Sequence, residues 1–404
     1  MKKSPLRVLA VVCITAVGLG FVAAVFCIGL TDKNAAERDF ISYWAAGQQL
    51  VRGANPYDLD AVQALERAVG RKDSQLVLTM RNPPIAFFLA WPLGLVSPKT
   101  GLIVWLFVLL GCLVLSVRLL WLLNGRPASI YHLLCFLFAP VLSCMMAGQF
   151  GIFLLLGIVL FLYFQRSQPF LAGAALLLCA LKPHLFLPFG VVLVLWTVSR
   201  KSYRILAGFS VALLASCGLS YWLDPHAWSE YNQMMHAGGA LGEKVPALSV
   251  YFRFLVDPNA VWLQFLPLGA ACVWAIWYFW TRREQWNWLD HGLMVLLVGA
   301  VCTPFGWFTD ESMLLPAVLA GLYRAEGSRR SVWPLAVIAA VALAEVIALV
   351  PLTGKYFLWT TPAWLAWYLY ATGRIGSRRV GASVASQKFV AKVRDGNAGP
   401  STPL

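Results

Sequence analysis

The chain has 404 residues, of which 60% are hydrophobic and only 12% are charged. A mean hydropathy of +0.70 excludes an ordinary soluble protein, because a water-soluble core cannot absorb so much apolar surface. The net charge of +14 comes with no nucleic-acid-binding motif, so we expect membrane lipids with anionic headgroups, and no nucleic acid, as partners of the basic residues. The composition predicts an all-α, polytopic membrane protein.

Apolar segments recur along the chain, and runs of about 20 apolar residues match a bilayer core of about 30 Å. The first segment resembles a signal peptide but has full span length and no convincing cleavage site, so we expect an uncleaved helix. The run at 85–96 is too short to span, and we expect it to lie at the interface or re-enter the membrane. About twelve transmembrane helices are predicted, at 8–30, 101–123, 129–147, 150–165, 169–182, 184–199, 203–223, 260–281, 288–306, 309–324, 332–351 and 355–372.

Basic residues are distributed unevenly between the two sides of this predicted bundle. With the N-terminus inside, 20 of the 32 Lys and Arg residues fall in inner segments or in the C-terminal tail. Eight others lie in the long first outer loop, at about 31–100, which is a poor reporter of orientation. The positive-inside rule therefore predicts that both termini are cytoplasmic in a multi-pass protein of the cell membrane, specifically a bacterial inner membrane.

Two further features complete the domain organisation. Residues 373–404 are rich in Gly, Ser, Arg and Ala and are expected to form a disordered, basic cytoplasmic tail after a transmembrane domain at 1–372. The nine cysteines lie almost entirely in apolar runs and form no CxxC pair, so we expect no metal site, no disulfide framework and no cofactor.

Unusual polar residues gather on the predicted extracytoplasmic side. Each has a simpler explanation: a lysine can snorkel at a helix end, a glutamine can satisfy a turn, and loop histidines and an acidic turn can be merely solvated. Glu345, inside an apolar helix, is expected to hydrogen-bond structurally or to be protonated. The convergence of several such residues on one side nevertheless favours a chemical site there: Asp39, Gln149, Lys182, His184, His226, His236, Arg253, Asp310 and Glu311.

The stretch RDFISYWAAGQQLVRGANPYD at 38–58 resembles the opening signature of glycosyltransferase family 87. Later segments follow in the family's order over about 39–316: Asn82-Pro83-Pro84, Pro92-Leu93, Gly148-Gln149, Leu181-Lys182-Pro183, Ser249 to Arg253, and Thr303 to Trp307. The mycobacterial mannosyltransferases of the family carry paired histidines where this chain has Thr309 and Asp310, and an aromatic residue often stands where it has Asn82.

The resemblance implies a GT-C membrane bundle with an extracytoplasmic active site. It implies an inverting glycosyltransferase that moves a hexose or pentose, with a mannose-like sugar favoured, from a polyprenyl-phosphate carrier to a lipid or glycan acceptor. By chemical type, Asp39 is the expected general base, and Lys182, His184 and Arg253 are expected to bind the donor phosphate. The expected sugar and acceptor pocket comprises Tyr43, Trp44, Tyr57, Gln149, Trp307 and Asp310.

Two alternatives stay open at this point. Twelve helices with both termini inside are also typical of secondary transporters, although no similar halves are detectable, and a flippase of lipid-linked sugars would need the same cations without a base. Asp39 could also be an N-cap for a helix beginning at Phe40, with Arg38 as a surface partner.

Overall fold

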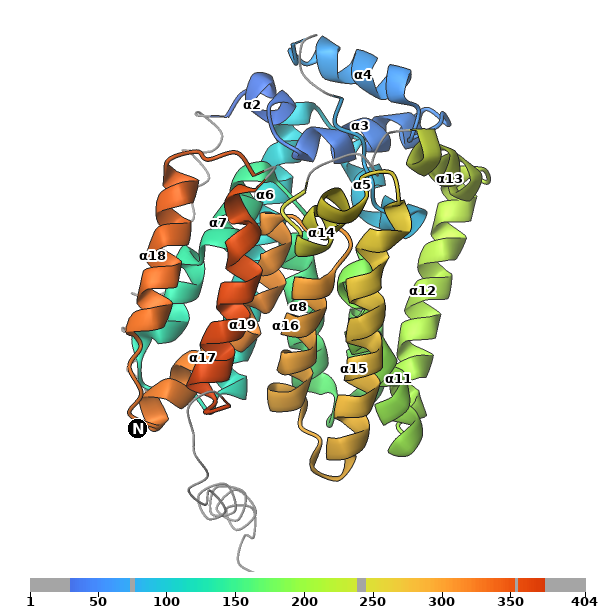
Figure 1. Cartoon of the computed structure of the whole chain (residues 1–404). Coiled ribbons are helices and arrows are strands. Elements are labelled where there is room, and N and C mark those ends of the chain that lie inside the picture. Colours follow the sequence, from blue (N-terminus) through green and yellow to red (C-terminus); the bar gives the residue numbers. More distant parts are fainter. Residues whose placement is uncertain (1–29, 73–76, 238–244, 353–354, 375–404) are drawn as a thin grey trace, which may run out of the picture.

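The computed structural model describes residues 30–72, 77–237, 245–352 and 355–374, and within these ranges every regular element is a helix. Short helices form a top layer, which comprises α2 (Asp32–Ala36), α3 (Phe40–Val51), α4 (Leu59–Ala68), η1 (Pro84–Ala86) and α5 (Phe87–Leu93). This layer lies across one end of a bundle of longer helices, with α13 (Ala227–Ala237) beside it (Figure 1). The predicted first outer loop, 31–100, is therefore largely helical in its described part.

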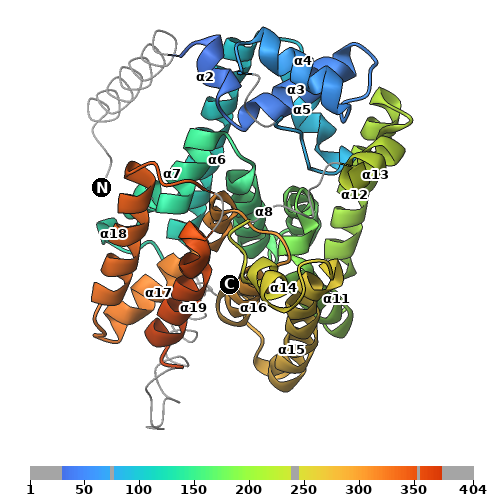
Figure 2. The ribbon, with the colours of Figure 1, turned by 45° about the horizontal axis from the view of Figure 1, so that its top comes forward.

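The longer helices of the bundle run roughly perpendicular to the top layer (Figures 1 and 2). Prolines in the first turn begin α6, α7, α9, α11, α15, α17 and α18, where a missing backbone N–H costs nothing. Its helices are α6 (Pro98–Leu123), α7 (Ala139–Ala147), α8 (Gly151–Phe164), α9 (Pro169–Ala175), α10 (Leu177–Ala180), α11 (Leu187–Ser199), α12 (Tyr203–Leu223), α14 (Leu248–Val256), α15 (Leu266–Arg282), α16 (Leu293–Cys302), α17 (Leu315–Gly327), α18 (Trp333–Ile347) and α19 (Thr360–Ala371).

Shorter turns link these helices. Most are 3-10 turns: η2 (Ile130–Leu137), η3 (Pro183–Leu185), η5 (Val261–Phe265), η6 (Arg283–Gln285), η8 (Phe308–Leu314) and η9 (Tyr356–Trp359), with one π turn, η7 (Trp288–Gly292). Several fall inside segments that the sequence predicts as single spans: η2 lies inside 129–147, η5 inside 260–281, η7 inside 288–306 and η9 inside 355–372.

Three helices in the described part of the chain are long and apolar enough to cross a membrane. They are Pro98–Leu123, Tyr203–Leu223 and Val261–Gln285, and a fourth span results if η2 and α7, bent by 43° at Phe138, count as one. The all-helical class and the membrane-type helices are thus confirmed. The total of twelve spans stays a prediction, and the first predicted span and the tail beyond Arg374 lie outside the described residues.

The helix that carries Asp39 is fixed by a very close crossing of α3 and α5. A Cβ on Gly47 would lie 2.1 Å from the Ala90 carbonyl oxygen, so only glycine fits here. Gln48 Nε2 donates to the Gly94 carbonyl at 2.7 Å, and Trp44 Nε1 donates to the Val96 carbonyl at 2.9 Å. The predicted segment 85–96 is thus a short helix packed on α3.

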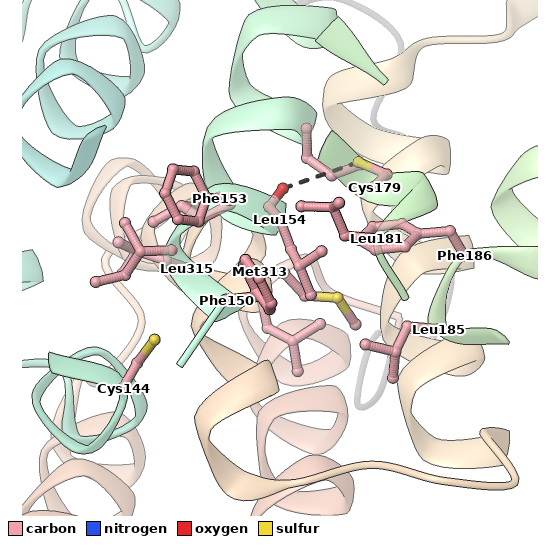
Figure 3. Packing of buried hydrophobic residues seen from close by; sticks show 14 of the residues in the cluster. Cys144, Phe150, Phe153, Leu154, Cys179, Leu181, Leu185, Phe186, Met313 and Leu315 are labelled. Atoms are coloured by element: carbon pink, nitrogen blue, oxygen red, sulfur yellow. Dashed lines mark hydrogen bonds between the residues drawn. The ribbon is translucent and has the colours of Figure 1, made fainter. Parts of the chain in front are cut away.

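Below the top layer, α8 approaches the η8 turn equally closely. A Cβ on Gly151 would lie 2.3 Å from the Thr309 carbonyl oxygen. The buried side chains of Phe150, Leu181 and Met313 belong to one hydrophobic cluster in this part of the core (Figure 3). This core holds three turns of the chain next to one another. They contain Gln149, Lys182 and Asp310.

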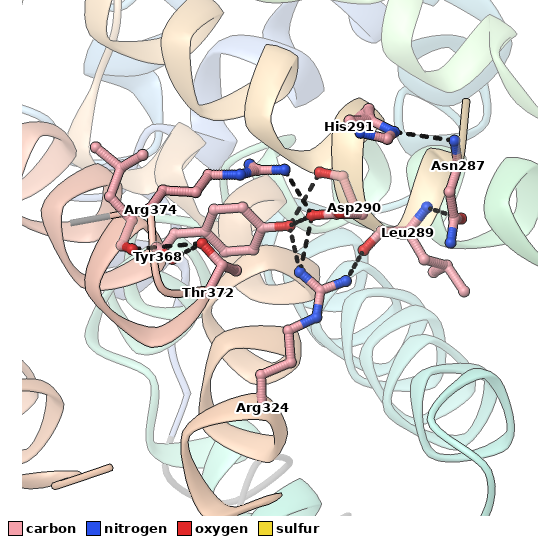
Figure 4. Close-up of polar contacts among 9 residues, drawn as sticks. Asn287, Leu289, Asp290, His291, Arg324, Tyr368, Thr372 and Arg374 are labelled. Atoms are coloured by element: carbon pink, nitrogen blue, oxygen red, sulfur yellow. Dashed lines mark hydrogen bonds and ion pairs between the residues drawn. The ribbon is translucent and has the colours of Figure 1, made fainter. Parts of the chain in front are cut away.

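A polar cluster lies where the α15–α16 connection meets the ends of α17 and α19 (Figure 4). Asp290 Oδ1 accepts from Arg324 at 3.0 Å and from Arg374 at 2.9 Å, and the Tyr368 hydroxyl donates to the Asp290 carbonyl at 3.0 Å. This connection lies at the end of the bundle away from the top layer (Figure 1). Elsewhere, Glu345 is part of a structural hydrogen bond, since Trp359 Nε1 donates to its Oε2 at 3.3 Å.

Candidate active site

Asp39 lies at the start of α3, and its carboxylate faces the turn between α7 and α8. Gln149 Nε2 donates to Asp39 Oδ2 at 2.5 Å, and the Tyr43 hydroxyl donates to Gln149 Oε1 at 3.0 Å. Gly148, at φ +72°, provides the left-handed residue that ends α7 and turns Gln149 toward α3. A carboxylate, an amide and a phenol therefore form one connected chain at the top of the bundle.

The N-cap alternative for Asp39 is wrong as far as its side chain is concerned. Helix α3 does begin at Phe40, but Asp39 itself has helical dihedral angles and its carboxylate accepts no capping hydrogen bond. The neighbouring Arg38 donates through Nη1 to the Met146 carbonyl. The Asp39 carboxylate is thus used for the Gln149 contact and stays half-buried rather than sealed.

Burial raises the pKa of Asp39 above its ordinary value, because desolvation disfavours the charged carboxylate. The hydrogen bond from Gln149 and the charges of Lys182 and Arg71 oppose this and lower the pKa, whereas the charge of Asp310 raises it. These influences place Lys182 and Asp310 within electrostatic reach of Asp39. A carboxylate with a raised pKa is a better proton acceptor than one free in water.

Lys182 and Asp310 form a direct ion pair. Lys182 Nζ lies 2.6 Å from Asp310 Oδ1, with 12% and 3% of the two side chains exposed. Asp310 Oδ2 also accepts from the backbone N–H of Trp307 at 3.1 Å, which fixes the carboxylate in its turn. Lys182 is therefore not a cation that simply snorkels to a helix end.

Glu311, which the sequence treats as part of a charged turn, is buried and joins η8 to the last helix. Thr360 Oγ1 donates to Glu311 Oε1 at 2.5 Å, and Trp364 Nε1 donates to Oε2 at 2.8 Å. These contacts hold the turn that presents Asp310. The only sign of this role in the sequence is that Glu311 follows Asp310 directly, because its partners lie 49 and 53 residues further along the chain.

The other residues expected at the donor phosphate lie around the loop before η8. Arg253 is 2% exposed, and its Nη1 donates to Gln264 Oε1 at 2.7 Å. His184 packs edge-on against Phe305, with ring centroids 6.0 Å apart. Trp307 and Asp310 line a cavity of about 20 Å³, which has room for about one water molecule and not for a sugar.

Three aromatic residues expected in the sugar pocket are buried, and Tyr43 among them is 3% exposed. Trp44 and Tyr57 are 5% and 2% exposed. Trp44 donates to the Val96 carbonyl, and the Tyr57 hydroxyl donates to the Asn82 carbonyl at 2.9 Å. Contact of either residue with a sugar stays a prediction. The two exposed histidines, His226 and His236, make local contacts at the ends of α13.

The family model of glycosyltransferase family 87 matches residues 81–304, which is more than half of the chain. The chain belongs to glycosyltransferase family 87. The enzyme is therefore a glycosyltransferase, as the sequence motifs predict. The matched range includes Gln149, Lys182, His184 and Arg253, whereas Asp39 and Asp310 lie on either side of it. No curated protein and no solved structure matches this glycosyltransferase.

Proposed function

We propose that this glycosyltransferase moves a hexose or pentose, with a mannose-like sugar favoured, from a polyprenyl-phosphate carrier to a lipid or glycan acceptor. The transfer takes place on the extracytoplasmic side of the cell membrane and inverts the anomeric centre. The observation that carries the proposal is the meeting of a partly accessible carboxylate, Asp39, with the Lys182–Asp310 pair at one end of an apolar helical bundle.

The reaction proposed is a single displacement. The acceptor hydroxyl oxygen forms a bond to the anomeric carbon while the bond from that carbon to the phosphate oxygen breaks. The electron pair of the broken bond stays on the phosphate, and the hydroxyl proton passes to Asp39, which later releases it to water. The products are the glycosylated acceptor and the polyprenyl phosphate.

Charge develops on the phosphate as its bond to the sugar breaks, and a cation held beside it stabilises that charge. Lys182 fits this role because its ammonium is held in place by Asp310 while 12% of its side chain stays exposed. Asp310 is its counter-ion in the structure. A bound phosphate competes for the same ammonium, so donor binding exchanges one anionic partner of Lys182 for another. We assign His184 and Arg253 to the same phosphate region.

The proposed pocket for sugar and acceptor extends from the Asp39–Gln149–Tyr43 chain toward Trp307 and Asp310. Gln149 has two roles in this proposal, since it lowers the pKa of the base and presents an amide near the reacting centre. Trp44 and Tyr57 support the pocket from the buried side. Asp310 is the second candidate for the base, because it also carries a carboxylate at this end.

A secondary transporter and a flippase of lipid-linked sugars are the competing proposals, and the family match favours neither of them. A flippase would bind the same donor through the same cations. It would not need the Asp39 carboxylate to accept a proton, so base substitution separates it from a transferase.

The test is a transfer assay with purified protein, radiolabelled polyprenyl-phosphate sugars and a panel of membrane lipids and glycans. We expect labelled product from at least one polyprenyl-phosphate sugar, with inverted anomeric configuration. Transfer from nucleotide sugars alone would contradict the proposed donor class. Movement of the labelled carrier across sealed vesicles without product would favour the flippase.

A further inference from the structure

The turn that carries Lys182 contains a backbone group that its own helix does not satisfy. Helix α10 ends at Ala180, and Pro183 has no N–H to donate. The Leu185 N–H, four residues after Leu181, donates instead to the Lys182 carbonyl at 3.2 Å. The carbonyl of the buried Leu181 thus depends on a donor from outside the turn, because an unsatisfied buried carbonyl is costly.

That donor is Asn82, 99 residues earlier in the chain. Its Nδ2 donates to the Leu181 carbonyl at 2.9 Å, and the Asn82 residue is 4% exposed. The residue that follows Leu181 is Lys182. The Asn82 contact therefore fixes the backbone directly before the ammonium that pairs with Asp310.

Asn82 is itself held firmly, because prolines make the segment after it rigid and because the backbone carbonyls of this segment accept hydrogen bonds. Pro83 and Pro84 restrict the backbone. The Tyr57 hydroxyl donates to the Asn82 carbonyl at 2.9 Å. On the far side, Ser220 and Ser216 of α12 donate to the carbonyls of Pro84 and Ile85, each at 2.7 Å.

We infer that Asn82 is a positioning residue for the donor phosphate. Through the Leu181 carbonyl it fixes the backbone before Lys182, and with it the position and direction of the Lys182 side chain. The inference rests on the proposed role of Lys182. Asn82 touches no reacting atom in this account and acts only through the Leu181 carbonyl. Its effect should therefore appear in the affinity for the donor rather than in the chemical step.

The experiment is a double-mutant cycle on the full chain, with polyprenyl-phosphate mannose as the donor probe. Asn82→Leu removes the amide donor at nearly constant size, and Lys182→Gln removes the ammonium while keeping a hydrogen-bond donor for Asp310. We expect Asn82→Leu to raise the donor KM about tenfold with kcat changed less than twofold. In the Lys182→Gln background the same substitution should change KM less than twofold, because Asn82 has no ammonium left to position.

Ser216→Ala is the matched control, because it removes a buried hydrogen bond to the same segment without touching Leu181. It should lower the melting temperature and leave the donor KM within twofold of wild type. If Asn82→Leu does not fold, Asn82→Ala replaces it, since alanine is neutral and has no side-chain N–H to offer the carbonyl; the same rise in KM is expected.

Two outcomes overturn the inference in different ways. In the first, Lys182→Gln weakens donor binding, but the folded Asn82 variant binds the donor normally or the two changes in KM multiply in the double variant. Asn82 then does not act through Lys182, and the inference alone fails. If Lys182→Gln itself leaves the donor KM unchanged, the phosphate assignment fails and the inference falls with it.

Discussion

The chemistry open to Asp39 depends on how tightly its carboxylate holds a proton. A general base must be ionised to work, so activity is lost as pH falls through the pKa of Asp39. Burial raises that pKa, and the loss should therefore begin at a higher pH than for a free aspartate. Gln149 lowers the pKa of Asp39, because its amide N–H stabilises the charged carboxylate.

Gln149→Leu should accordingly move the acid limb of the kcat/KM profile to higher pH. The substitution removes the hydrogen bond that lowers the pKa of Asp39, so the carboxylate takes up its proton earlier on acidification. The measurement is the transfer rate across a series of pH values at low donor concentration, which reports the free enzyme. An acid limb that stays in place, or that moves to lower pH, contradicts Asp39 as the base.

Lys182→Gln should raise the donor KM by roughly 10- to 100-fold. A hydrogen bond to a charged group contributes about 1.5–3 kcal/mol, and 1.4 kcal/mol corresponds to a factor of ten. Lys33→Gln is the control, because Lys33 is a cation of the top layer that is 67% exposed and pairs loosely with Glu37 at 4.0 Å. Equal donor KM values for the two variants would remove Lys182 from the phosphate site.

The sequence identifies candidate site residues where a polar or charged side chain stands beside apolar segments. Asp39, Gln149, Lys182 and Asp310 are of this kind. The structure brings these four together. Glu311 and Asn82 could not be assigned in advance, because their roles depend on partners 49 to 99 residues away. Hydrogen bonds of that kind leave no local pattern in a single sequence.

At the scale of elements, the α3–α5 crossing decides where the Asp39 carboxylate is held. The backbones of Gly47 and Gly94 touch, and a Cβ on Gly94 would lie 2.1 Å from the Gly47 carbonyl carbon. The crossing therefore tolerates no side chain at either position. Because Asp39 is one residue before α3, any shift of that helix also moves the carboxylate.

Gly47→Ala should destabilise the protein by about 3 kcal/mol and reduce transfer, since overpacking of this kind commonly costs 1–3 kcal/mol. Gly111→Ala in α6 is the matched control, because a Cβ there meets nothing within 4 Å and alanine favours a helix. Thermal unfolding in the same detergent compares the two. Equal stability of both variants would show that the α3–α5 contact is looser than described.

Apolar runs predict which segments are helical but not where each helix breaks. The prediction at 101–123 agrees closely with α6, an uninterrupted helix at Pro98–Leu123. The prediction at 288–306 is less accurate, since α16 ends at Cys302 before Thr303-Pro304 and the π turn η7 precedes it. Prolines and close packing against neighbouring helices set these ends, and packing is not visible in hydropathy.

At the scale of the whole molecule, the two ends of the bundle differ in chemistry. One end carries Asp39, Gln149 and the Lys182–Asp310 pair, and the other carries the Arg324 and Arg374 cluster on Asp290. The positive-inside rule places the arginine-rich end in the cytoplasm. With that orientation, the proposed active site would face the extracytoplasmic side.

This orientation predicts the labelling of single cysteines placed after the nine native ones are replaced. Lys33→Cys should react with a membrane-impermeant maleimide on intact spheroplasts. Arg283→Cys, with 44% of the native side chain exposed, should react only after the membrane is broken. The reverse pattern would invert the topology and place the proposed site in the cytoplasm.

The central claim is that Asp39 accepts the acceptor's proton, and Asp39→Asn tests it most directly. Asparagine keeps an oxygen to accept the Gln149 hydrogen bond but cannot take up a proton at neutral pH. We predict normal folding and donor binding with a turnover reduced by about 10²-fold or more, the usual contribution of general-base catalysis. An Asp39→Asn enzyme that transfers sugar from polyprenyl phosphate at a near-normal rate would contradict the account and direct attention to Asp310 as the base.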